Sequence, residues 1–327
     1  ARIIIYSKKI NAAMLGMEMA TQNINDGYPE ALLRSLRKGF LSDDIYGQIK
    51  NCSNSSEFKL VLEDTDYGTD LFNAEEGKEN VEVSQLRKKM KQRLMDQFQF
   101  ILAQSCYPLN AFIVKMLHGY QIDNVVFIIE GLKGGRTMDE LLKTADPLGY
   151  FPELKNIMPV EDNDYASLYQ TVLIDLPVGV YFRKFMNEIT AGGAAADDNV
   201  EMDSRFIADA MKDYNLQQIQ LRVKKIWLHE FYDWCETSLN ETSAEVMMDL
   251  LKFEADMMTI QIIANSLSFR DLSDAKGREV ERKKYISRVG YLYPERDELL
   301  SKVNDFKAMM LALEATPYEE MLRRVNQ

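Results

Sequence analysis

The feature that most constrains the fold is a long apolar stretch around Lys252–Leu267, KFEADMMTIQIIANSL. Apolar residues alternate along it at four- and three-residue spacings: Val246, Leu250, Phe253, Met257, Ile260, Ala264 and Leu267. This spacing places them on one face of an α-helix. A second apolar row lies beside the first: Met247, Leu251, Ala255, Met258 and Ile262. The remaining polar strip is narrow: Glu245, Asp249, Lys252, Asp256 and Thr259. We predict a central core helix on which Asp256 and Lys252 form an exposed i,i+4 pair.

A second stretch repeats this pattern earlier in the chain. Tyr120–Gly131, YQIDNVVFIIEG, places an aromatic residue three positions before Asp123, as Phe253 stands three positions before Asp256. Both aspartates precede apolar runs, and they are 133 residues apart. We therefore expect two core helices related by an internal repeat.

A short proline motif supports the same period. Three of the eight prolines lie between an aromatic residue and a glutamate, a context that ordinary composition gives to roughly one proline in a hundred. These motifs predict a repeat of roughly 120–140 residues. The simpler interpretation is architectural, because proline followed by glutamate is a favourable start for a helix. The predicted repeat residues are Tyr28, Pro29, Glu30, Asp123, Asn124, Phe151, Pro152, Glu153, Phe253, Asp256, Asn265, Tyr293, Pro294 and Glu295.

The composition favours helices throughout and excludes several classes of partner. The 327 residues include only 16 glycines and 8 prolines, and strand-like alternation is limited to short runs such as Lys59–Leu62, so we predict an all-α fold. The net charge of −12 repels nucleic-acid phosphates, so no nucleic-acid partner is expected. Three separated cysteines without a CxxC motif favour reduced thiols. No apolar run approaches the ~20 residues that cross a bilayer.

Residues for catalysis or metal binding form no recognisable pattern. His118 and His229 are the only histidines, and neither lies in an HExxH motif. The turn Gly131–Thr137, GLKGGRT, lacks the spacing and the lysine of a phosphate-binding loop. An EF-hand loop starting at Asp162 would require Gly and Glu where Ser167 and Leu173 stand. We expect no catalytic, cofactor-binding or metal-binding residues and no small-molecule substrate.

The chain is predicted to contain one large helical domain after a short extension. Residues 1–18 form the extension, and residues 19–327 form the domain, with repeat units at 19–145, 146–288 and 289–327. Mobile loops are expected at 75–83, which is charged, and at 190–203, which is small and acidic. A third core helix would fall roughly 70 residues beyond Gln327, so we expect the third unit to be incomplete and the parent protein to continue.

Seven ordered segments resemble subunit d of vacuolar-type proton-pumping ATPases, a family related to the C-type subunits of archaeal rotary ATPases. They are Asn25–Gly39, Asp64–Gly68, Gln121–Gly131, Asp146–Phe151, Ser167–Phe182, Phe253–Ser266 and Gly290–Glu295. The resemblance covers about Gln22 to Gln327. It implies three pseudo-symmetric helical units forming a funnel-like scaffold, with a further C-terminal helical segment.

The resemblance also implies a non-catalytic function. Such a subunit lies on the cytosolic mouth of the membrane rotor ring, receives the tip of the central stalk, and couples ATP hydrolysis elsewhere to proton transport. The implied partners are the proteolipid c-ring and the central-stalk subunits, and membrane association is indirect. The implied location is the cytosolic face of vacuolar, lysosomal or endosomal membranes. The alternative hypotheses are a free-standing helical-repeat adaptor that binds proteins, and a helical enzyme with an unrecognised site.

Overall fold

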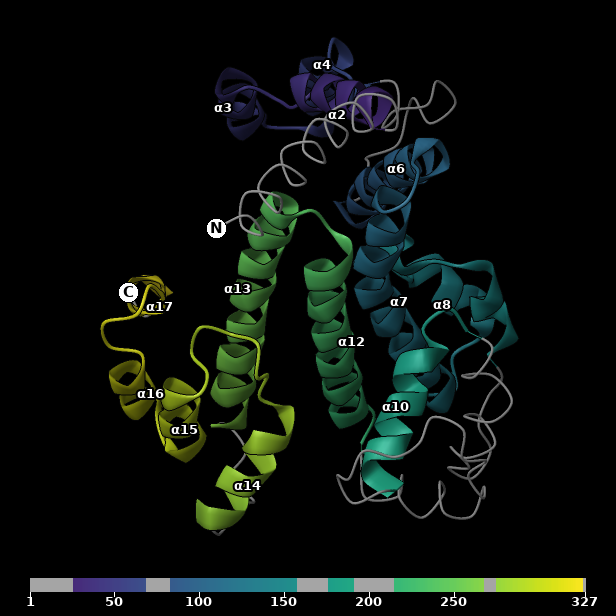
Figure 1. Cartoon of the computed structure of the whole chain (residues 1–327). Coiled ribbons are helices and arrows are strands. Elements are labelled where there is room, and N and C mark those ends of the chain that lie inside the picture. The colour runs from purple at the N-terminus through teal and green to yellow at the C-terminus, as the bar shows by residue number, and fades with distance from the viewer. Residues whose placement is uncertain (1–25, 69–82, 158–175, 191–214, 268–274, 326–327) are drawn as a thin grey trace, which may run out of the picture. The chain divides into compact units, whose positions relative to one another are not determined.

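The computed structural model describes residues 26–68, 83–157, 176–190, 215–267 and 275–325 (Figure 1). Within these ranges every regular element is a helix: thirteen α-helices and two short 3-10 helices. The predicted all-α class is therefore confirmed. The described chain divides into two compact units, one formed up to Leu117 together with Asp146–Leu148, and the other by His118–Ala145 and the residues from Gly149 onward. The three-unit repeat remains a prediction.

The first unit contains four complete helices and the beginning of a fifth. These are α2 (Gly27–Lys38), α3 (Asp43–Asn51), α4 (Ser55–Glu63), α6 (Val83–Gln104) and the first part of α7 (Leu109–Lys133). The Ser42 side chain caps α3 by accepting a hydrogen bond from the Ile45 amide. Its core consists of Met95, Ile101, Ile113, Leu117 and Leu148, against which parts of α2 also pack.

The second unit is built around the remainder of α7 and two longer helices that follow one another in the chain. After α7 come α8 (Met138–Thr144), the 3-10 helices η2 (Pro147–Gly149) and η3 (Pro152–Asn156), α10 (Gly179–Thr190), α12 (Leu216–Ser238) and α13 (Glu241–Ser266). The helices α12 and α13 pack antiparallel as a hairpin (Figure 1). The chain then forms α14 (Ala275–Tyr285), α15 (Glu295–Lys302), α16 (Phe306–Ala312) and α17 (Tyr318–Val325).

The helix α13 is the predicted core helix, but the structure buries a different face from the one predicted. Its buried residues are Ala244, Leu251, Ala255, Asp256, Thr259, Ile260, Ile262 and Ile263. In the predicted apolar row, Val246, Leu250 and Phe253 are exposed. In the predicted polar strip, Asp256 and Thr259 are buried, so the expected exposed pair between Asp256 and Lys252 is wrong. A helix that is apolar on nearly all sides has no periodic signal for which side its neighbours will cover.

The helix α7 is long and apolar enough to cross a membrane, by length and composition alone, although no apolar run of this length is expected from the sequence. It is 25 residues long, and 56% of its most apolar window is buried inside the fold. Its glycines allow close packing: a Cβ on Gly119 would lie 2.8 Å from the Trp227 ring, and one on Gly131 would lie 2.2 Å from Leu141. In this structure α7 packs as a core helix.

The structure bears on several segments that the sequence predicts to be loops or extensions. The predicted loops 75–83 and 190–203 lie almost wholly outside the described residues, but Val83 begins α6 and Thr190 ends α10. The extension 1–18 also lies outside the described residues. The charged helix α14 contains a buried residue, Arg282, whose side chain donates hydrogen bonds to the Ser266 hydroxyl and to two backbone carbonyls.

Candidate functional site around Asp256

The most extensive buried polar site that involves the predicted repeat residues surrounds Asp256. Asp256 lies in the middle of α13, and its side chain is 1% exposed. Its carboxylate faces the loop between α14 and α15. One carboxylate oxygen, Oδ1, accepts the amide of Leu292 at 3.1 Å, and the other, Oδ2, accepts the amide of Tyr291 at 3.0 Å. A third segment joins through α17, because the Tyr318 hydroxyl donates to Oδ2 at 2.7 Å. One side chain therefore connects three segments that are distant in sequence.

Gly290 is required for this arrangement. A Cβ added at this position would lie 1.9 Å from Asp256 Oδ1, far inside any real contact. The loop backbone can therefore approach the carboxylate only because position 290 has no side chain. We call Asp256, Gly290, Tyr291, Leu292 and Tyr318 the Asp256 cluster.

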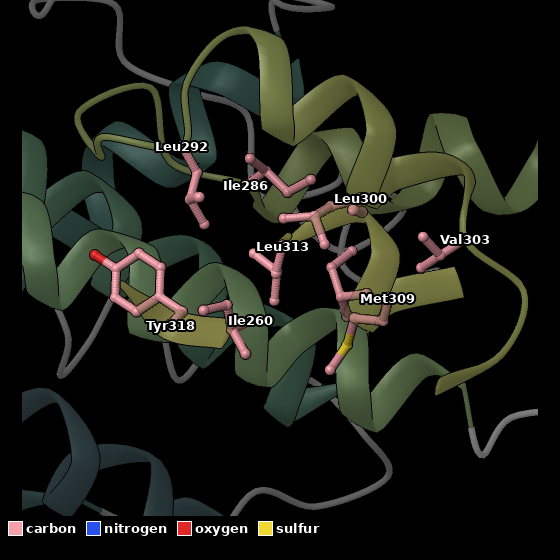
Figure 2. Close-up of a cluster of buried hydrophobic side chains, with 10 residues drawn as sticks. Ile260, Ile286, Leu292, Leu300, Val303, Met309, Leu313 and Tyr318 are labelled. Carbon is pink, nitrogen blue, oxygen red and sulfur yellow. The ribbon is translucent and has the colours of Figure 1, made fainter. Parts of the chain in front are cut away.

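An apolar core surrounds the Asp256 cluster and explains its electrostatics. Leu292 and Tyr318 pack with Ile260, Ile286, Leu300 and other apolar side chains (Figure 2). This burial raises the pKa of Asp256, although the bonds from Tyr318, Leu292 and Tyr291 oppose the increase. Burial and the bond to Asp256 also raise the pKa of Tyr318, so its hydroxyl remains a donor.

A second buried carboxyl group lies in the same region. Asp297, in the first turn of α15, is 7% exposed, and its Oδ1 has no hydrogen-bond partner among the described residues. Burial, and then the charge of Asp256, raise its pKa to about 7, while Lys225 opposes the increase. Asp297 therefore changes charge near neutral pH.

On α12, two basic groups lie near this loop. His229 Nε2 lies 2.9 Å from the Ser287 hydroxyl and also accepts the amide of Arg288 at 3.4 Å. Burial, and then the charge of Lys225, lower the pKa of His229 to about 4, so the ring is neutral at pH 7. Burial also lowers the pKa of Lys225 to about 8, and its ammonium donates to the carbonyl of Lys284.

The described contacts of these groups are with other groups of the protein. Ser287 and His229 form the pair that a nucleophile and its base would form, but Ser287 is buried and its oxygen also accepts the amide of Val289. His118 bonds the Tyr181 hydroxyl. Within the described residues, no group of three or more His, Cys, Asp or Glu side chains is arranged to hold a metal ion.

The structure brings only some of the predicted repeat residues together. Asp256 and the motif Tyr293-Pro294-Glu295 share one site, because the Asp256 cluster holds the loop that leads into Pro294. Phe253 lies at the edge of that site, with its ring centroid 6.0 Å from the Tyr318 ring. Asn265, near the end of α13, is exposed and lies outside the cluster.

Asp123 and Asp256 have different surroundings, contrary to the predicted correspondence. Asp123 accepts hydrogen bonds from Gln220 at 2.5 Å and Lys224 at 2.7 Å on α12. Gly149, the last residue of η2, packs against α7: a Cβ there would lie 2.2 Å from the carbonyl oxygen of Tyr120 and 2.7 Å from the side-chain nitrogen of Asn124. Asn124, one position after Asp123, is thus the side chain beside Gly149, although the Tyr120 backbone lies closer, whereas the Asp256 carboxylate is the nearest neighbour of Gly290.

The three proline motifs all lie at the start of a helical segment. In Tyr28-Pro29-Glu30, which falls in the first turn of α2, Glu30 pairs with Arg34 at 2.6 Å. In Phe151-Pro152-Glu153, the aromatic residue is buried and precedes η3. In Tyr293-Pro294-Glu295, the proline is the residue before α15.

Sequence reasoning missed three residues of this region: Gly290, Asp297 and Tyr318. Gly290 did appear in the segment Gly290–Glu295, but a single glycine does not identify the side chain that approaches it. Tyr318 lies 62 residues from Asp256, and no local spacing links the two. Only a fold that brings α13, the loop and α17 together reveals the site.

The described fold and site define an all-α protein in which buried polar groups hold helices and loops together. Comparison with known proteins identifies which kind. A family model described as ATP synthase (C/AC39) subunit matches residues 29–327. The chain therefore belongs to this family of rotary ATPase subunits.

Curated relatives specify the branch of the family. V-type proton ATPase subunit d of Saccharomyces cerevisiae is 30% identical over 93% of this chain and 79% of its own length. The subunit d of Dictyostelium discoideum is 32% identical over 87% of this chain and 71% of its own length. A probable subunit d of Oryza sativa subsp. japonica is 29% identical over 96% of this chain and 80% of its own length. The chain is thus a member of the V-type ATPase subunit d family.

Proposed function

We propose that this protein is a non-catalytic coupling subunit of a rotary proton-transporting V-type ATPase. It connects the central stalk to the proteolipid c-ring, so that ATP hydrolysis in other subunits drives proton transport. It resides on the cytosolic face of vacuolar, lysosomal or endosomal membranes and is held there through the complex. The observation that supports this proposal most strongly is the family match over residues 29–327 together with relatives named as V-type proton ATPase subunit d.

The described structure is consistent with the mechanical requirement of this function. A coupling subunit transmits torque without slipping, and densely packed interiors transmit strain. The helices α12 and α13 are 23 and 26 residues long and pack along each other. Asp256 then connects α13 to the loop before α15 and to α17. We propose that these contacts oppose shear within the second unit.

The domain organisation that we propose remains three related helical units in residues 19–327, with Asn124 and Asp256 as the corresponding side chains of the first two core helices. Each of these side chains lies close to a glycine of a following segment, Asn124 to Gly149 and Asp256 to Gly290, and this supports the assignment.

The test is to remove the chain from the cells that make it and to measure ATP-driven acidification of isolated membrane vesicles. We expect acidification to be lost and to return with the wild-type chain. A tagged chain should co-purify from detergent-treated membranes with proteolipid and stalk subunits. Normal acidification without the chain, or recovery of the chain only with unrelated soluble proteins, would contradict the proposal and favour the adaptor hypothesis.

A further inference from the structure

One apolar row on α13 is covered along half its length and exposed along the other half. In the covered half, Met257, Ile260 and Ala264 belong to or pack against the core shown in Figure 2. In the other half, Val246 and Leu250 are each 56% exposed and Phe253 is 49% exposed. The contact between the Phe253 and Tyr318 rings marks the boundary between the two halves. The exposed half is therefore a continuation of a helix-packing face.

The size of the exposed face fits one helix. Val246, Leu250 and Phe253 follow one another at i, i+4 and i+7, which spans two turns and about 10 Å along the axis. The face is one side chain wide, as expected for a ridge that packs into the groove of a neighbouring helix. We call these three residues the α13 face.

Carboxylates line the α13 face on both sides. By helical geometry, Glu245 and Asp249 lie on one side and Glu254 on the other, and all three residues are exposed. Asp249 accepts the Tyr291 hydroxyl at 2.6 Å and lies 4.0 Å from the Lys252 ammonium. Among the described residues, neither Glu245 nor Glu254 forms an ion pair. This border favours a partner with positive charge on both flanks of its apolar stripe.

From these observations we infer that the α13 face binds an amphipathic α-helix of another polypeptide, with apolar residues at i, i+4 and i+7 flanked by Lys or Arg. A second copy of this chain, pairing through the same face, would place carboxylates against carboxylates. An anionic membrane surface would be repelled by the same border. The inference does not depend on the coupling function, because it is based only on burial and charge around α13.

The experiment places a photoreactive phenylalanine analogue at Leu250 of the full chain in its own cells. Isolated membranes are irradiated, and the cross-linked segment is sequenced by mass spectrometry. The expected adduct is with a segment of another protein that has the apolar stripe and flanking Lys or Arg residues. An adduct with lipid, with a second copy, with the same chain or with a segment that lacks this pattern would overturn the inference. So would the absence of an adduct.

Two controls distinguish specific binding at the α13 face from non-specific cross-linking. The same analogue at Leu299, an exposed residue of α15, should give at least fivefold less of this adduct. Replacing both border residues (Glu245→Lys with Glu254→Lys) should lower the adduct from Leu250 at least fivefold at low salt, while Glu314→Lys after α16 should not. Circular dichroism checks that each variant is folded, which the exposure of these positions favours. Equal yields in all variants would refute the role of the border charges. If the segment with the expected pattern belongs to a protein outside any rotary ATPase, the inference stands and the proposed function fails.

Discussion

At the scale of single residues, the position of Asp256 explains why a carboxylate is needed there. Both oxygens accept backbone amides, and one of them also accepts the Tyr318 hydroxyl. All three partners are donors, so the site requires a side chain with two acceptor oxygens. An asparagine of the same shape would direct an NH2 group at one of these donors.

We predict that Asp256→Asn lowers the free energy of unfolding by about 2–4 kcal/mol, because a buried donor loses its acceptor and faces another donor. Urea unfolding followed by circular dichroism measures this change. The matched control is Asp249→Asn on the exposed side of the same helix, which should cost less than about 1 kcal/mol. Equal effects of the two substitutions would contradict the prediction, because the buried carboxylate would then matter no more than the exposed one.

Asp297 gives a prediction about pH. The pKa of its carboxyl group is raised from 3.8 to about 7, so between these values the folded state retains a proton that the unfolded state has lost. Its contribution to stability is thus full below pH 3.8 and is lost as the pH rises through about 7. Asp297→Asn should become more stable than wild type over this range, by about 2 kcal/mol at pH 8.

The control for this prediction is His229, whose pKa is shifted in the opposite direction. Its pKa is lowered from 6.5 to about 4, so its contribution is full above pH 6.5 and is lost as the pH falls toward 4. In urea unfolding from pH 4 to pH 8, His229→Gln should lose less stability than wild type as the pH falls from 6.5 to 4. Above pH 7 the pH dependence of the free energy of unfolding should be the same in both proteins. A constant difference between Asp297→Asn and wild type at every pH would contradict the raised pKa.

At the scale of helices, close approach depends on small residues at contact points. Gly119 on α7 allows the Trp227 ring of α12 to pack against the helix backbone, and Gly131 admits Leu141 of α8. The ion pair between Asp123 and Lys224 lies at the same α7–α12 contact and is partly exposed. Burial of Trp227 therefore contributes more to this contact than the ion pair does.

We predict that Gly119→Ala destabilises the protein by about 1–3 kcal/mol, although alanine is the better helix former. The new Cβ would lie 2.8 Å from the Trp227 ring, which has no flexible end that can move aside. Thermal unfolding measures the effect. Gly47→Ala in α3, where no atom lies within 4 Å of the added Cβ, should instead stabilise by up to about 1 kcal/mol. If both variants gained stability, the close packing of α7 and α12 would be disproved.

Arg282 connects three helical segments and gives a second prediction at this scale. It bonds Ser266 at the end of α13 and the carbonyls of Ser301 and Val303 at the end of α15. Arg282→Lys should lower the free energy of unfolding by about 2–4 kcal/mol, because one ammonium cannot reach all three acceptors. Urea unfolding provides the measurement. The exposed neighbour substitution Lys283→Met should cost no more than about 0.5 kcal/mol, and a similarly small loss for Arg282→Lys would contradict the prediction.

At the scale of the whole molecule, the net charge of −12 is the dominant long-range property. Like charges on a compact protein repel each other, and added salt screens this repulsion.

We predict that the midpoint of thermal unfolding at pH 7.5 rises by several degrees between about 10 mM and 300 mM NaCl. The rise should be smaller at pH 5, where carboxylates begin to gain protons and the net charge falls. Differential scanning calorimetry measures both series. A midpoint that falls with salt at pH 7.5 would mean that attractive surface ion pairs outweigh the overall repulsion.

The sequence by itself determined the all-α class, the positions of the long helices α7 and α13, and the helical starts at the three proline motifs. These features depend on local periodicity, on few glycines and prolines and on capping, all of which the chain shows without its tertiary neighbours.

Only the tertiary structure decided which side of α13 is covered, that Asp256 is buried, and that Asn124 is buried while Asp123 pairs with Lys224. Periodicity shows which residues share a helical face, but the covering neighbour is set by contacts between distant segments. A shift of one residue turns a side chain by about 100° around the helix axis. On α7 that rotation separates Asp123, which is half-buried and pairs with Lys224, from Asn124, which is buried.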